Sequence, residues 1–245
     1  MTPTSHIDGP NARLAYAFTD GAGPVIVFLS GYKSDMQGTK AVHLESWARA
    51  RGRAFLRLDY SGHGESGGRF EDGCIGDWTA DARAVIDAVA PGPVVLVGSS
   101  MGGWIASLLT QQLDRVVGLV GIAAAPDFTE DGFWAEMNES QRREMAERGV
   151  WYRPSAYGDP YAVTARLIED GRRHLVLRAP LPMPFPVRLL QGTQDEAVSR
   201  DTALRLLDHI ESPDLQLTLV KGADHRFSEP GNLSMIEAAL EEVAK

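Results

Sequence analysis

The sequence predicts an α/β fold with a mostly parallel central sheet, helices on both faces of the sheet and a helical lid insertion. Short apolar runs bounded by Gly or Pro alternate with helix-like stretches, which is the order of strands joined by right-handed crossovers. A long segment over about 127–180 interrupts this alternation. With 245 residues, 44% of them hydrophobic, the chain is large enough for one sizeable core. We therefore predict a single domain over 1–245 that carries the insertion.

The expected strands are short, apolar and often β-branched, as strands buried on both faces of a sheet are. One more strand, near "RLAYAF" at 13–18, is expected to pair antiparallel at the sheet edge. The other expected strands cover 24–30, 54–60, 93–98, 116–123, 186–192 and 215–222.

Helical patterns lie between most of these runs. In "DWTADARAVIDAVA" the apolar residues Trp78, Val85 and Val89 recur on one helical face, as in a helix that packs against a sheet. The expected helices cover 39–51, 77–90, 101–113, 199–210 and 231–244.

The segment from Asp127 to Pro180 shows no clean strand. It contains the charged helical stretch "NESQRREMAERG" and is followed by the proline-rich "LPMPFP". We interpret it as a lid over the end of the sheet. Its aromatic residues fit an apolar acyl or aryl pocket, or equally the packing of the lid onto the body; they are Phe128, Phe133, Trp134, Trp151, Tyr152, Tyr157 and Tyr161.

Composition excludes several classes of protein. The net charge of −9 argues against a nucleic-acid binder, because phosphate contacts need clustered Lys and Arg. The single cysteine, Cys74, excludes an internal disulfide framework and a cysteine-rich metal site. The N-terminal stretch has no basic cluster leading into an apolar run, and the longest apolar run, 116–125, is shorter than the roughly 20 residues that cross a bilayer. We expect a soluble, cytoplasmic protein with no transmembrane segment.

Two stretches match the pattern G-x-S-x-G, which places a serine on a tight strand-to-helix turn. The match at 98–102 follows an apolar strand and opens a helix, whereas the match at 64–68 has no helix directly after it. The glycines flank Ser100 symmetrically and do not flank Ser99, so Ser100 is the candidate nucleophile. The alternative is an ordinary N-cap serine at a glycine-rich turn.

A serine hydroxyl needs a base to take its proton and a group that orients the base. Asp195 follows the strand at 186–192, and His225 follows the last strand, so the order along the chain is Ser, acid, His. Asp127 also follows a strand and is the main rival acid. Glu196 and Asp224 are less well placed, and the other histidines lie in the tail, in helices, in the glycine-rich loop or in the insertion.

The oxyanion that forms when a serine attacks a carbonyl needs hydrogen-bond donors. The backbone amide of Met101, the residue after the candidate nucleophile, is one expected donor. The second is expected from the turn "SGYK", and we choose the amide of Tyr32. The alternative for "SGYK" is a turn with no such role.

Several motifs together resemble the α/β-hydrolase family from about residue 22 onward: "FLSGY", "DYSGHGES", "VGSSMGG", "QGTQDEAV" and "GADHRF". More narrowly, "SGYKSDMQGTKA", "LVGSSMGGW" and "GVWYRPSAY" are similar to mammalian mitochondrial abhydrolases that act as acyl-glucuronide esterases and protein S-depalmitoylases. The resemblance implies that Ser100, Asp195 and His225 form the triad and that neither a cofactor nor a metal ion takes part. Because the chain begins without an Arg-rich transit segment, we do not carry the mitochondrial location over.

The resulting hypothesis is a serine hydrolase that cleaves an ester or thioester of a small-molecule or acylated substrate by way of an acyl-enzyme. The same triad could cleave an amide or a C–C bond beside a ketone. A third hypothesis, from another class, is a catalytically silent binding protein on the same fold.

Overall fold

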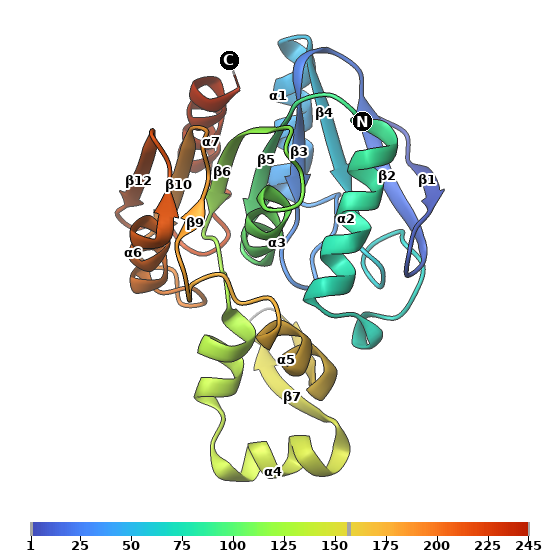
Figure 1. Cartoon of the computed structure of the whole chain (residues 1–245), viewed down its shortest axis with the longest axis vertical. Coiled ribbons are helices and arrows are strands. Elements are labelled where there is room, and N and C mark those ends of the chain that lie inside the picture. Colours follow the sequence, from blue (N-terminus) through green and yellow to red (C-terminus); the bar gives the residue numbers. More distant parts are fainter. Residues whose placement is uncertain (1, 156–157, 245) are drawn as a thin grey trace.

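The computed structural model describes residues 2–155 and 158–244, and its centre is an eight-stranded sheet (Figure 1). Tyr157, one of the aromatic residues noted in the insertion, lies outside the described residues. Six neighbouring strands are parallel, and at one side two further strands are added, each paired antiparallel with its inner neighbour. In spatial order the strands are β1 (Ser5–Asp8), β2 (Arg13–Thr19), β4 (Arg53–Leu58), β3 (Ala22–Leu29), β5 (Val94–Ser99), β6 (Val116–Ile122), β10 (Val187–Gly192) and β12 (Leu215–Val220).

The mostly parallel sheet predicted from the sequence is confirmed. The antiparallel strand expected near "RLAYAF" is β2, which pairs with β4. It is not the edge strand, because β1 pairs along its outer side. The sequence did not reveal β1, since "SHID" is only four residues long and has no apolar alternation.

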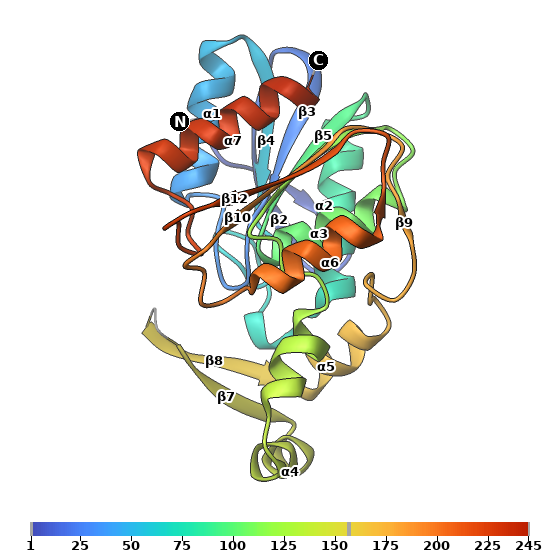
Figure 2. The same ribbon diagram turned by 90° about the vertical axis from the view of Figure 1, so that its left-hand side faces the viewer.

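Helices cover both faces of the sheet, and each face has its own hydrophobic core (Figure 2). Side chains alternate along β5, so Val94 and Leu96 belong to one core and Val95 and Val97 to the other. The first core packs against α2 (Ile75–Val89), α3 (Met101–Thr110) and α6 (Arg200–His209), and the second packs against α1 (Thr39–Ala50) and α7 (Pro230–Val243). Among the described residues, no helix is both long enough and apolar enough to span a bilayer.

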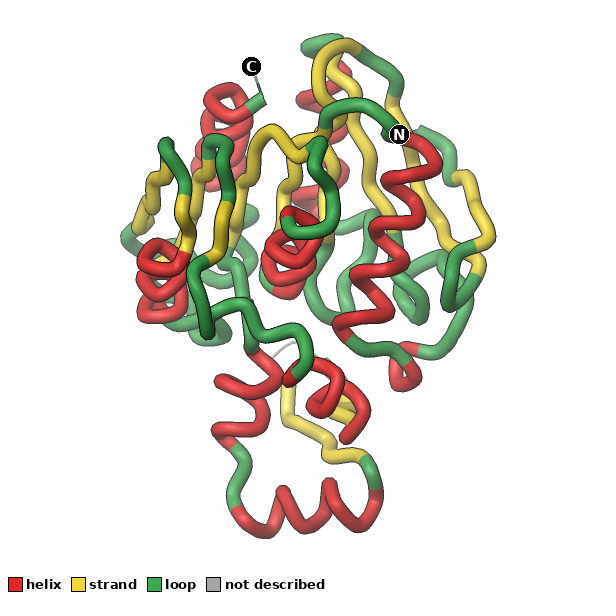
Figure 3. Tube along the Cα trace, in the orientation of Figure 1, coloured by secondary structure: helices red, strands yellow, loops and turns green. Residues whose placement is uncertain are grey.

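The insertion follows β6 and lies at one end of the sheet, below the body in Figure 3. It has a small hydrophobic core of its own, made of Phe133, Met137, Met145, Trp151, Val163 and Ile168. Its elements are the π-helix η2 (Phe128–Trp134), α4 (Glu139–Arg148), β7 (Val150–Ser155), β8 (Gly158–Thr164) and α5 (Ala165–Arg172). Short segments outside these elements are the 3-10 helix η1 (Phe70–Asp72) and the paired strands β9 (Leu181–Pro182) and β11 (Ile210–Glu211).

The expectation that the insertion holds no clean strand was wrong, because β7 and β8 form an antiparallel hairpin. Trp151 pairs with Val163 and Arg153 with Tyr161, so these four side chains share one face of the hairpin. Prolines at positions 154 and 160 interrupt the apolar alternation of both strands in the sequence. The predicted charged helix is α4.

Candidate active site

Ser100 lies on a sharp turn between β5 and α3. Its backbone has φ +54° and ψ −120°, a strained conformation for a residue other than glycine. Three backbone hydrogen bonds hold it there. The Ser100 amide donates to Ile122 at 2.9 Å, and the Ser100 carbonyl accepts from Gly103 at 2.9 Å and from Ala125 at 3.0 Å.

Close packing explains the two glycines of the Gly98–Gly102 motif. A Cβ atom on Gly98 would lie 2.4 Å from the carbonyl oxygen of Gly102, and one on Gly102 would lie 2.0 Å from that of Leu29. Both distances are far below van der Waals contact, so any side chain at either position would push the turn away from the sheet. The motif is therefore a steric requirement of this turn.

The second G-x-S-x-G match has a different role. Ser66 donates a hydrogen bond to the carbonyl oxygen of Asp59 at 2.7 Å and accepts one from the amide of Ala15 at 2.8 Å. These bonds join its loop to β2 and to the end of β4. The Ser66 hydroxyl thus both donates to and accepts from the backbone, which is the arrangement of a structural serine.

The three residues proposed as a triad converge, although they lie far apart in the sequence. The Nε2 atom of His225 is 3.2 Å from the Ser100 hydroxyl, and its Nδ1 atom is 2.9 Å from Oδ2 of Asp195. The Asp195 side chain is fully buried, and that of His225 is 19% exposed. With Nδ1 donating to the carboxylate, Nε2 is an acceptor that faces the hydroxyl.

The Asp195 carboxylate is held as an anion. Its Oδ1 atom accepts from the amides of Ala197 at 2.9 Å and Val198 at 2.8 Å, and its Oδ2 atom accepts from the side-chain amide of Gln191 at 3.0 Å. Burial acts to raise the pKa of Asp195, but the hydrogen bond and charge of His225, with the bonds from Val198 and Gln191, outweigh burial and lower it. A stable carboxylate fixes both the orientation and the tautomer of the imidazole.

The rival acid, Asp127, has other partners. Its carboxylate accepts from the amides of Val176 at 2.8 Å and Leu177 at 2.9 Å and lies 3.1 Å from the guanidinium of Arg178. Burial raises the pKa of Asp127 in spite of these bonds. These contacts join the first residue of the insertion to residues near its end, so Asp127 holds the two ends of the insertion together.

The remaining rivals also lie apart from the triad contacts. The Glu196 side chain is exposed, and Asp224 accepts a hydrogen bond from the amide of Phe227 at 3.1 Å. Four other histidines have partners elsewhere: Glu237 for His43, Ser61 for His63, Asp170 for His174 and Arg205 for His209.

The turn after β3 lies against Ser100. A Cβ atom on Gly31 would be 3.3 Å from the Cβ atom of Ser100. Among the contacts of the described residues, no hydrogen bond uses the amide of Tyr32 or that of Met101. The Met101 amide is also the first of α3, where the helix dipole favours negative charge. Neither amide therefore has an acceptor among the described residues, as an oxyanion donor requires.

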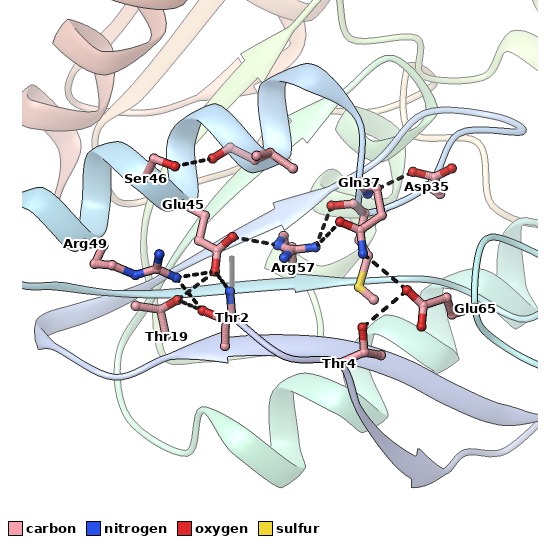
Figure 4. Close-up of polar contacts among 12 residues, drawn as sticks. Thr2, Thr4, Thr19, Asp35, Gln37, Glu45, Ser46, Arg49, Arg57 and Glu65 are labelled. Carbon is pink, nitrogen blue, oxygen red and sulfur yellow. Dashed lines mark hydrogen bonds and ion pairs between the residues drawn. The ribbon is translucent and has the colours of Figure 1, made fainter.

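A buried ion pair anchors the far end of this turn (Figure 4). Arg57 lies 3.1 Å from Glu45 and donates to the carbonyl oxygen of Met36 at 3.0 Å and to the side chain of Gln37 at 3.1 Å. The amide of Met36 donates to Asp59 at 2.7 Å. The sequence gives one signal for this role, an arginine placed between two leucines of a buried strand, and that signal does not identify its partners.

Comparison with known proteins agrees with the fold. The sequence profile described as "Alpha/beta hydrolase family" matches residues 26–245. The chain is 36% identical to palmitoyl-protein thioesterase ABHD10, mitochondrial, from Bos taurus, over 98% of this chain and 78% of the relative. A putative hydrolase from Agrobacterium vitis S4 has a structure with TM-score 0.97 and 38% identity over the whole of both chains. The mouse alpha/beta hydrolase domain-containing protein 10 has TM-score 0.90 and 33% identity over 98% of both chains.

These comparisons confirm the resemblance drawn from the sequence motifs and correct one expectation. The predicted cytoplasmic location was wrong, because the bovine relative is named as mitochondrial. That prediction rested on two absences, of a basic N-terminal cluster and of an apolar run long enough to cross a bilayer, and an absence does not assign a location. The profile match and the near full-length likeness to the mouse protein establish that this chain is a hydrolase and belongs to the alpha/beta hydrolase family.

Proposed function

We propose that this protein is a serine hydrolase that cleaves carboxylic esters or thioesters, with Ser100 as nucleophile, His225 as general base and acid, and Asp195 as the group that orients His225. The observation that carries the proposal is the continuous path of two contacts, 3.2 Å from the serine to the imidazole and 2.9 Å from the imidazole to the carboxylate. The name of the bovine relative, a palmitoyl-protein thioesterase, supports a thioester or ester substrate.

In the first half of the reaction, His225 Nε2 takes the proton of the Ser100 hydroxyl while Oγ forms a bond to the carbonyl carbon. The carbonyl oxygen becomes an oxyanion that the amides of Met101 and Tyr32 stabilise by hydrogen bonds. When this intermediate collapses, the bond to the alcohol or thiol breaks, and His225 gives its proton to the leaving group. The acyl group stays on Ser100.

In the second half, a water molecule gives a proton to His225 and attacks the acyl carbon. The new intermediate collapses, the bond to Ser100 breaks and the proton returns to the serine hydroxyl. A carboxylic acid leaves. Asp195 remains an anion throughout and stabilises the imidazolium that forms twice in each cycle.

We further propose that the insertion over 127–180 is a lid above the acyl side of this site. The aromatic rings of Phe128, Phe133 and Tyr161 lie beside Tyr32, the residue whose amide is a proposed oxyanion donor. An apolar wall next to the reacting carbonyl favours an acyl group that is itself apolar.

A fluorophosphonate probe and a substrate panel test this proposal. We expect the wild type to label and to hydrolyse p-nitrophenyl esters or acyl thioesters, and Ser100→Ala to do neither. Ser66→Ala, which removes the serine of the other G-x-S-x-G match, is the matched control and should label like the wild type. Equal labelling of wild type and Ser100→Ala would refute the nucleophile, and activity on aminoacyl amides alone would refute the ester or thioester assignment.

A further inference from the structure

The side chain of Tyr32 joins the turn after β3 to the lid. We propose that Tyr32 is a positioning residue that couples the lid to the oxyanion hole: its backbone amide lies beside the reacting carbonyl only while its side chain is seated against β8 and η2. This inference rests on the proposed function, in which that amide is one of two oxyanion donors.

The first observation is a polar contact between the two parts. The Tyr32 hydroxyl donates a hydrogen bond of 3.0 Å to the carbonyl oxygen of Ala162, a buried residue of β8. Burial, followed by the nearby Tyr161 and Glu71, raises the pKa of Tyr32 well above its ordinary value, so the hydroxyl stays a donor. The amide and the hydroxyl belong to one residue, and a displacement of β8 therefore acts directly on the residue that carries the proposed oxyanion donor.

The second observation is the set of rings around Tyr32. Its ring meets Phe128 and Phe133 of η2 at centroid distances of 5.6 and 5.8 Å and Tyr161 of β8 at 5.8 Å. All three are edge-to-face contacts, the geometry that aromatic pairs favour. Phe70, at 4.8 Å, and Trp78, at 5.9 Å, belong to the body. The ring is thus held between the body and two elements of the lid, η2 and β8.

The third observation concerns what else holds this end of the turn. Arg57 and Asp59 bind Met36, at the far end of the turn. Among the described residues, the one backbone bond that spans Tyr32 runs from the Ser34 amide to the Gly31 carbonyl at 3.1 Å. Lys33 has φ +56°, a conformation that a residue other than glycine keeps only where its surroundings impose it. Its Nζ atom lies 5.6 Å from the centre of the Tyr161 ring, so the next residue also docks on β8.

The consequence is a site that is complete only with the lid seated. With β8 and η2 in place, both amides face the oxyanion. When they move away, Tyr32 loses its hydrogen bond and three of its ring contacts, and the Met101 amide, fixed by α3, remains as the single donor. Lid closure over an acyl group therefore assembles the catalytic arrangement as well as covering it.

Steady-state kinetics on a p-nitrophenyl ester test the coupling. Tyr32→Phe keeps the ring and removes the bond to Ala162, and we expect kcat to fall about 3- to 10-fold while KM changes less than about twofold, in proportion to one lost hydrogen bond. Tyr32→Leu also removes the ring and should approach the roughly 10²- to 10³-fold loss that follows removal of an oxyanion donor. Tyr152→Phe is the matched control, since it removes a hydroxyl from an exposed tyrosine of the same hairpin, and it should behave as the wild type.

Two further readouts separate positioning from a general loss of structure. A trifluoromethyl ketone places its hemiketal oxygen in the oxyanion hole, so its inhibition constant should rise in Tyr32→Phe by the same factor by which kcat/KM falls. Hydrogen exchange in the same variant should quicken in peptides covering 31–36 and 158–164 together and stay unchanged in those covering α2.

Each outcome bears on a definite claim. An unchanged kcat in Tyr32→Phe, or an effect confined to KM, would overturn the coupling. If Ser100→Ala is inactive in the same assay, the proposed function still stands. Activity in Ser100→Ala would overturn the proposed function itself.

Discussion

The carboxylate of Asp127, at the start of the lid, accepts a 2.9 Å hydrogen bond from the amide of Leu177, just beyond the last helix of the lid. Two residues fifty positions apart are thereby brought to one point at the carboxyl end of β6. This bond shows that an acid at a strand end can have a structural role. Asp127 binds the amide of Leu177, whereas Asp195 binds the imidazole of His225.

Asp127→Asn should leave the chemistry nearly intact and weaken the base of the lid. An amide can accept one of the two backbone bonds but loses the charge that faces Arg178, so we expect the free energy of unfolding to fall by about 1–3 kcal/mol. On a small ester, kcat should stay within about twofold of the wild type. Denaturant unfolding measures the stability and steady-state kinetics measures kcat. A large fall in kcat with normal stability would indicate that Asp127 is a catalytic acid.

Asp195→Asn should have the opposite effect. The amide can donate to His225 and so favour the wrong tautomer, which leaves no acceptor nitrogen facing Ser100. By analogy with the same change in serine proteases, we expect kcat to fall by about 10⁴-fold. The measurement is kcat of Asp195→Asn and of Asp127→Asn on the same ester under the same conditions. Equal activities of the two variants would be incompatible with this division of roles.

Arg57→Met should destabilise the protein more than a surface substitution does. It removes one of the two arginines that pair with the Glu45 carboxylate, with Arg49 remaining at 2.8 Å, and it frees the Met36 carbonyl. Breaking a fully buried pair typically costs about 3–5 kcal/mol, and we expect a loss near the lower end of that range because Arg49 still faces Glu45. Replacing Glu45 by Gln in the same chain should recover part of the loss. Thermal unfolding of the single and double variants measures the effect, and additive losses would show that the pair is not coupled.

Stability should depend on pH through His174. The hydrogen bond to Asp170 raises the pKa of His174, against burial and the charge of Arg173. Because the folded state holds this proton more tightly, the stabilisation is complete below the unfolded pKa of about 6.5 and is lost as the pH rises through the folded value. The difference in Tm between the wild type and His174→Gln should therefore be larger at pH 6 than at pH 9. A difference that does not change with pH would contradict the assigned protonation.

The sequence predicts the parallel sheet, its helices and the convergence of the proposed triad because each rests on a local pattern. Buried parallel strands read as apolar runs, and side chains just beyond them meet at one edge. The hairpin β7–β8 was missed because its stability comes from pairing and from packing on Phe133, while its prolines break the alternation in the sequence.

The contacts of Tyr32 and Arg57 could not be predicted for a related reason. Each side chain meets partners that are distant in sequence and belong to different elements, such as Ala162 for Tyr32 and Glu45 for Arg57. No periodicity or motif encodes such a pairing. A tyrosine in a turn and an arginine in an apolar strand signal only that some partner must exist.

The six residues that form the interior of the lid belong to neither of the two cores that flank the sheet. Apart from Phe133, whose ring contacts Tyr32, substitutions among them can change the lid interior without loosening the two cores that hold the nucleophile in place. Substrate preference can therefore change through exchange of lid residues, provided that the lid keeps a carbonyl oxygen within hydrogen-bond distance of the Tyr32 hydroxyl.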